Sequence, residues 1–185
     1  CYSGSFNEKN VEHGEGAILL DANGNLVYKG RMENGMKHGN GYFKDPGSGT
    51  EFKGVFAKDK FVTGTVRRGS VTIRAEGFIK DGAPLGFTII EDKDEEIFRG
   101  HIDAAGKKQG NVKWIIPEND GKSIFVGKVR DSCKVQGEET TLDAAGDFVA
   151  YYKGSFNSSS LRHSKFACER TAKDEYKGQF VNGER

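Results

Sequence analysis

The sequence has little apolar material and no long hydrophobic run. Only 35% of its 185 residues are hydrophobic, whereas 26 are glycine. This is too little apolar mass for a thick, deeply buried core. The longest apolar runs, such as 17–20 and 87–90, have about four residues, far fewer than the roughly 20 that cross a bilayer as a helix. We therefore expect no transmembrane segment.

The sequence also has few cysteines and a net charge close to zero. Cys1, Cys133 and Cys168 are odd in number, far apart and without a CxxC spacing, which argues against a disulfide framework and a zinc site. We therefore expect a reducing, cytoplasmic location. The chain carries 28 basic and 27 acidic residues, for a net charge of +1. Bulk electrostatics gives no sign of a nucleic-acid partner, so any charge argument must rest on local pattern.

What the sequence does contain is a repeat. An aromatic-x-Gly-x-hydrophobic motif, which opens as Tyr2-Ser-Gly4-Ser-Phe6, starts again near residues 28, 52, 75, 98, 125 and 152, with a partial repeat at 176. Successive starts lie 23 to 27 residues apart. A fixed period with small variation indicates one structural unit whose loops differ in length, repeated through 1–185.

Each repeat has the pattern of two β-strands. Positions one, three and five of the motif are mostly aromatic, glycine and apolar, whereas positions two and four are mostly polar, which is the alternation of a half-buried strand. A second glycine follows nine or ten residues later, as in His13-Gly14, and begins the second strand. Turn formers such as Asn34-Gly35 and Asp81-Gly82 lie between the two halves. They predict a hairpin in each repeat.

The repeat predicts an all-β fold. We expect an elongated single-layer antiparallel meander of stacked β-hairpin repeats, a right-handed twisted rod in which each hairpin contacts mainly its neighbours. The aromatic residues would share one core face. Because glycine weakens a strand, its recurrence needs a packing reason, and we expect each motif glycine to leave a gap for a ring of the neighbouring hairpin.

These features resemble the MORN repeat (membrane occupation and recognition nexus). The Tyr-x-Gly-x-hydrophobic start, the Asn-Gly turn and the His-Gly-x-Gly of 13–16 and 38–41 carry the resemblance, which spans nearly the whole chain. It implies a scaffold that binds a protein partner or self-associates, at a membrane or a cytoskeletal structure. Similar repeats also precede SET-type lysine methyltransferase and phosphoinositide kinase domains. An accessory domain of such an enzyme, or a phosphoinositide- or membrane-binding module, is therefore the alternative.

Catalytic, metal and cofactor sites find little support. The glycine pairs in 14–16 and 39–41 are not followed by a helix pattern that could hold a phosphate. His13 and His38 occupy equivalent positions of successive repeats, which the meander would hold about 10 Å apart, too far to share a metal ion. The acidic run 91–96 lacks the spacing of a calcium loop. We therefore predict a non-catalytic module without a metal or cofactor.

The face opposite the aromatic residues is the candidate binding surface. Alternation sends the second and fourth motif positions there, where they would form a ladder of cations for an anionic partner or an anionic phospholipid. Glu76 and Val126 interrupt it, and Glu15 and Glu138 share the face, so a solvated surface of mixed charge is the alternative. The ladder consists of Lys29, Arg31, Lys53, Arg99, Lys128, Lys153 and Lys177.

The same face is predicted to carry apolar side chains. A single-layer sheet must cover both sides, so we expect these side chains to line a groove that a partner protein or a second copy of the chain covers. They are Leu19, Tyr42, Phe78, Phe87, Ile89 and Ile115.

Overall fold

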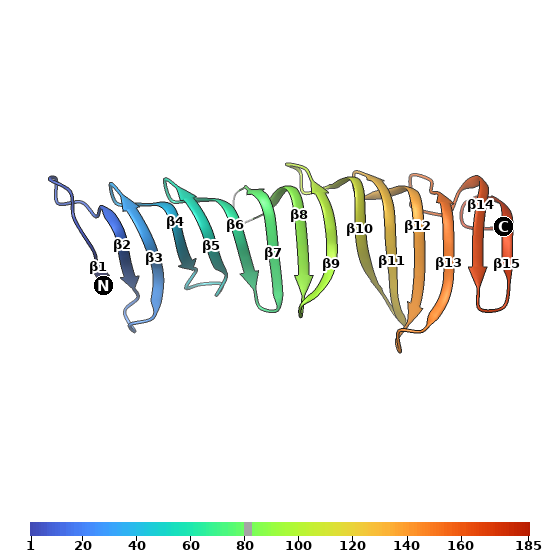
Figure 1. Ribbon diagram of the computed structural model, residues 1–185, viewed down its shortest axis with the longest axis horizontal. Coiled ribbons are helices and arrows are strands. Elements are labelled where there is room, and N and C mark those ends of the chain that lie inside the picture. The colour runs from blue at the N-terminus through green and yellow to red at the C-terminus, as the bar shows by residue number, and fades with distance from the viewer. Residues whose placement is uncertain (80–82) are drawn as a thin grey trace. The chain divides into compact units, whose positions relative to one another are not determined.

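The computed structural model describes residues 1–79 and 83–185. These residues form an all-β fold without helices, in which fifteen strands follow one another in sequence order as antiparallel hairpins of an open meander (Figure 1). The predicted all-β hairpin meander is therefore confirmed. No helix of the described residues is long and apolar enough to cross a membrane. The chain divides into two compact units, Cys1–Glu95 and Glu96–Arg185.

The odd-numbered strands carry the motif and the even-numbered strands carry the second half of each repeat. Unit 1 contains β1 (Tyr2–Ser3), β2 (Gly14–Leu20), β3 (Leu26–Glu33), β4 (Met36–Lys44), β5 (Glu51–Ala57), β6 (Lys60–Arg68), β7 (Val71–Phe78) and β8 (Pro84–Asp92). Unit 2 contains β9 (Glu95–Ile102), whose first residue ends unit 1, then β10 (Lys108–Glu118), β11 (Gly121–Arg130), β12 (Cys133–Asp143), β13 (Phe148–Ser155), β14 (Ser164–Thr171) and β15 (Glu175–Phe180).

Tight turns close the hairpins. Asn34-Gly35 between β3 and β4 has φ values of 51° and 77°, and Lys58-Asp59 between β5 and β6 has 49° and 65°. Positive φ at both central residues is the type I′ geometry, whose twist matches that of the strands it joins. The predicted Asn34-Gly35 turn is confirmed, whereas the predicted Asp81-Gly82 turn lies outside the described residues.

Hairpin turns of both units are also bonded to the preceding repeat. The Gly35 amide donates to the Glu12 carbonyl at 2.9 Å, and the Asn34 amide donates to His13 Nδ1 at 3.4 Å. The pattern returns in unit 2, where the Asn182 amide donates to His163 Nδ1 at 3.4 Å. These histidines therefore act as acceptors that fix one repeat on the next.

The motif tyrosine explains the motif glycine. Tyr28 Oη donates to the Arg31 carbonyl at 2.7 Å, and Tyr152 Oη donates to the Ser155 carbonyl at 2.8 Å, so each ring lies back over its own strand. A Cβ on Gly154 would lie 2.4 Å from Tyr152 Oη. The expectation that a ring from the neighbouring hairpin fills this gap was wrong, because the ring two residues earlier in the same strand fills it.

The core is a row of rings that passes from repeat to repeat. In unit 1 the Tyr28 and Phe56 centroids lie 5.8 Å apart, and in unit 2 those of Tyr152 and Phe180 lie 5.3 Å apart. All four side chains are almost fully buried. Each pair joins the first position of one motif to the fifth position of the next, with the edge-to-face geometry that aromatic rings prefer. The aromatic face is therefore the structural face of both units.

Candidate binding faces

The strand register assigns side chains to the two faces of unit 1. Residues directly opposite each other on paired strands share a face, and Lys29, Tyr42 and Lys53 are opposite one another on β3, β4 and β5. The row continues through Thr65 and Arg74 to Ile89. We call this side the polar face of unit 1. The structure thus brings together two of the predicted cations and two of the predicted groove residues.

Phe87 joins Ile89 on this face. The two side chains flank Thr88, which is buried on the aromatic face, and the side chain of Phe87 is 44% exposed. The Phe87 amide donates to Glu76 Oε2 at 2.9 Å. Glu76, which was predicted only to interrupt the ladder, therefore fixes the strand that carries Phe87.

Leu19 and Phe78 lie on the aromatic face, so their predicted place in the groove was wrong. Leu19 lies opposite Tyr28, and Phe78 is 8% exposed with its ring centroid 5.0 Å from that of Phe61. In β2 the register shift between Gly14 and Ala17 adds one residue before Leu19. A bulge of this kind turns every following side chain of the strand to the other face. At the second shift, Ala75 to Gly77 of β7 oppose Thr88 to Leu85, so the extra residue lies in β8, and Phe78 follows this irregular pairing at the end of β7.

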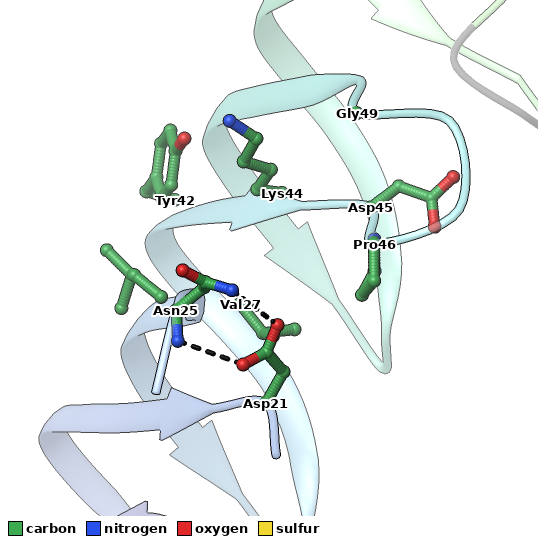
Figure 2. Close-up of a pocket in the computed structure, with 9 residues that line it drawn as sticks. Asp21, Asn25, Val27, Tyr42, Lys44, Asp45, Pro46 and Gly49 are labelled. Atoms are coloured by element: carbon green, nitrogen blue, oxygen red, sulfur yellow. Dashed lines mark hydrogen bonds between the residues drawn. The ribbon is translucent and has the colours of Figure 1, made fainter. Parts of the chain in front are cut away.

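Two hollows flank Tyr42 on unit 1. One, of about 550 Å³, is lined by residues that include Val27, Tyr42, Lys44 and Asp45 (Figure 2). The other, of about 680 Å³, is lined by residues that include Lys29, Lys53 and Thr65. Tyr42 thus lines both hollows, and each hollow also has at least one lysine in its lining.

The carboxylates near these hollows already have partners. Asp21 accepts hydrogen bonds from the amide of Asn25 at 2.9 Å and from its Nδ2 at 3.0 Å (Figure 2). Side-chain hydrogen bonds from Asn25 and Ser48 lower the pKa values of Asp21 and Asp45, respectively. Within the described part of the chain, no group of three or more His, Cys, Asp or Glu side chains is placed to hold a metal ion. Asp21 and Asp45 therefore stabilise their own turns by accepting hydrogen bonds.

Unit 2 has a corresponding polar face on which cations predominate. One row of opposite residues crosses strands β9 to β15 and consists of Arg99, Lys113, Val126, Glu138, Lys153, Cys168 and Lys177. The adjacent row consists of Ile115, Ile124, Thr140, Tyr151, Arg170 and Glu175. Lys128 lies on the same face, opposite Asn111 and Gln136. The predicted Ile115 therefore shares this face with four predicted cations.

The ladder residues differ in their ion pairs. Lys153 lies 2.8 Å from Glu138, and Lys177 lies 3.0 Å from Glu175. Side-chain hydrogen bonds within these pairs lower the pKa of each carboxylate and raise the pKa of each ammonium group. Arg99 pairs with Glu96, and Arg31 lies 3.5 Å from Glu15. Lys29, Lys53 and Lys128 form no ion pair with any described residue.

Phe166, which the sequence interpretation missed, is the most exposed large apolar side chain of the described residues. It is 90% exposed, and Val126 on the same face is 51% exposed. Both line a hollow of about 880 Å³ together with Lys153, Cys168 and Lys177. Its signal was a phenylalanine in the repeat where Ser164 replaces the second glycine.

An ionic ladder on the aromatic face of unit 2 was also missed. Lys134 pairs with Glu139, Arg162 lies between Glu139 and Glu169, and Arg185 lies 2.8 Å from Glu169. Each carboxylate belongs to a residue that is 8% exposed. The Arg162 guanidinium also lies 4.9 Å from the Tyr152 ring centroid. This ladder is part of the core, whereas the predicted cations are on the solvent side.

The fold and these faces define a class of protein: a hairpin repeat array with one structural face and one polar, partly apolar face. No family model matches the chain, and the search of curated proteins finds no significant match.

Proposed function

We propose that the chain is a MORN-type repeat array that acts as a non-catalytic protein-interaction module, and that its partner binds the polar face of unit 2. The observation that carries the proposal is Phe166, which stands 90% exposed beside a hollow that also contains Val126. Exposed apolar groups gathered at a depression and surrounded by polar side chains are typical of protein interfaces.

The motif residues support the MORN-type assignment. Tyr28, Tyr152 and Tyr176 all place a hydroxyl over a motif glycine and donate to the carbonyl three residues later. Aromatic rings, glycines and histidine acceptors are thus used to build the array. What remains for recognition is the polar face, because repeat arrays of this kind bind through their extended surfaces.

Comparative affinity capture tests the proposal. Proteins retained by the wild-type chain are compared with those retained by Phe166→Ser, with Leu161→Ser as the matched control. Leu161 is an apolar residue of the same unit that is also exposed but does not line the hollow. We expect a specific partner to be lost with Phe166→Ser and kept with Leu161→Ser. Retention of every partner by both variants would contradict the proposal.

Self-association is measured on the same samples. Light scattering over a range of concentrations reports the mass of the wild-type chain and of Phe166→Ser. A partner face that is free in solution predicts the same mass for both variants. A concentration-dependent mass that only the wild type shows would instead place a second copy of the chain on the hollow.

A further inference from the structure

Cations outnumber carboxylates on the polar face of unit 2. The rows of the polar face contain six cations, Arg99, Lys113, Lys128, Lys153, Arg170 and Lys177, against the two carboxylates of Glu138 and Glu175. Glu96 reaches two of these cations, Arg99 and Lys113. The whole chain has a net charge of only +1. The polar face of unit 2 is therefore basic because of the distribution of charged residues, and not because the chain as a whole is basic.

Two cations near the hollow lack an internal counter-charge. Neither Lys128 nor Lys165 forms an ion pair with any residue in 1–79 or 83–185. Lys165 lines the hollow beside Phe166, and Lys128 lies opposite Gln136, another lining residue. The cations that are paired, Lys153 and Lys177, form exposed pairs whose side chains are 64% and 72% exposed. Solvent-exposed pairs contribute little, so a partner's carboxylates can replace the internal ones.

The floor of the hollow consists of backbone. Gly137, Gly154 and Gly178 line it, and a Cβ on any of them would meet a ring of the aromatic face, namely that of Phe125, Tyr152 or Tyr176. No side chain therefore rises from these positions toward the polar face. An apolar side chain of a partner can rest on this floor between Phe166 and Val126.

Together these features select one kind of occupant. On the basis of the proposed function, we propose that the polar face of unit 2 binds an extended acidic segment of a partner protein, with an apolar side chain in the hollow beside Phe166. A second copy of the same face is disfavoured because it is equally basic. A bilayer is disfavoured because Phe166 borders a depression that a flat lipid surface would leave unfilled.

The strand spacing sets the spacing of the acidic residues. Strands lie about 4.8 Å apart, and an extended segment in the polyproline II conformation rises about 3.1 Å per residue with three residues per turn, so that every third side chain points to the same side. Lys153 and Lys177 are two strands apart, on β13 and β15, so carboxylates three residues apart in a segment that crosses the strands would match them. Glutamate at every third position is therefore the best pattern.

Fluorescence anisotropy with labelled peptides tests this inference on the whole chain. The probes are synthetic peptides of about twelve residues with a central leucine and glutamate at every second, third or fourth position, a design set by the rise and the three-residue turn of a polyproline II chain. We expect the every-third peptide to bind tightest. Its glutamine version should bind at least about tenfold more weakly, in line with the loss of charge-assisted contacts.

Variants of the chain locate the binding. Phe166→Ser and the double variant Lys128→Glu/Lys165→Glu should each weaken binding of the glutamate peptide about tenfold or more. The double variant should gain binding to a peptide in which lysine replaces every glutamate. Lys9→Glu, an exposed lysine of unit 1, is the matched control and should change nothing. Circular dichroism checks that each variant is folded.

Three results would overturn the inference. They are equal binding of glutamate and glutamine peptides, an equal loss with Lys9→Glu, and Phe166-dependent binding to phosphatidylserine vesicles without binding to any peptide. If no peptide binds but Phe166→Ser still loses a captured partner, the inference of an acidic segment is refuted and the proposed function is retained. If the Phe166→Ser variant also captures the same partners as the wild type, both the inference and the proposed function are refuted.

Discussion

Glu139 is the carboxylate whose removal should cost the most stability. It pairs with Lys134 and lies 3.8 Å from Arg162, in a site where the side chains of Glu139 and Lys134 are only 10% and 13% exposed. Removing one partner of a buried ion pair leaves the other charge uncompensated, at a cost of about 3 to 5 kcal/mol. Glu139→Gln should cost about 3 kcal/mol, the lower end of that range, because Arg162 keeps Glu169.

The neighbouring residue provides the matched control. Glu138 lies on the polar face, where its pair with Lys153 has side chains that are 46% and 64% exposed. Exposed pairs contribute about 0 to 1 kcal/mol, so Glu138→Gln should change the free energy of unfolding by less than about 1 kcal/mol. The assay is urea unfolding of both variants, with the slope of the transition compared to that of the wild type.

A double variant completes the test. Lys134→Met in the Glu139→Gln background removes the orphaned ammonium group and should recover part of the loss, because an apolar replacement of a whole buried pair is often neutral. Equal destabilisation by Glu138→Gln and Glu139→Gln would refute the assignment of these two residues to opposite faces. The absence of any recovery with Lys134→Met would refute the role of the buried pair.

Three further predictions test the packing. Phe78→Ala should cost about 3 kcal/mol in urea unfolding, against about 1 kcal/mol or less for Phe87→Ala; the reverse order would contradict the placement of Phe78 on the aromatic face and of Phe87 on the polar face. Gly154→Ala should cost about 1 to 3 kcal/mol because its Cβ meets Tyr152, whereas Gly47→Ala, which meets nothing closer than 3.8 Å, should be nearly neutral, and equal costs would argue against the ring position. Burial raises the pKa of Tyr28 from 10.0 to about 12, so its stabilising contribution is complete below pH 10 and is lost as the pH rises through about 12. Difference absorbance titration against Tyr28→Phe measures that pKa, and ionisation near 10 would contradict the burial.

The hairpin architecture could be predicted because the same short sequence motif recurs along the chain. Tyr28 and Gly30 recur as Tyr152 and Gly154, and a period-two pattern between turn formers leaves few alternatives to a strand. The Asn34-Gly35 turn followed from the backbone freedom of its residues.

The face of individual side chains was less predictable. Leu19 follows a bulge in its own strand and Phe78 follows one in the paired strand β8, and a bulge adds a single residue without a clear sequence signal. Glu139 occupies the register position that Trp114 holds in β10. From the sequence such a residue belongs to a solvated surface, because nothing in the pattern shows that Lys134 and, from the next repeat, Arg162 lie beside it on the aromatic face. Phe166 was missed because the one local signal, the replacement of the second glycine by Ser164, does not by itself distinguish an exposed phenylalanine from a core one.

Site-specific photo-crosslinking tests most directly whether the partner lies on the polar face of unit 2. Benzoylphenylalanine is placed at Phe166 on the polar face or at Trp114, which is opposite Phe125 on the aromatic face, and the captured partner is added before irradiation. We expect a crosslinked product from position 166 and none from position 114. A crosslink from position 114 alone would place the partner on the aromatic face and contradict the proposed function.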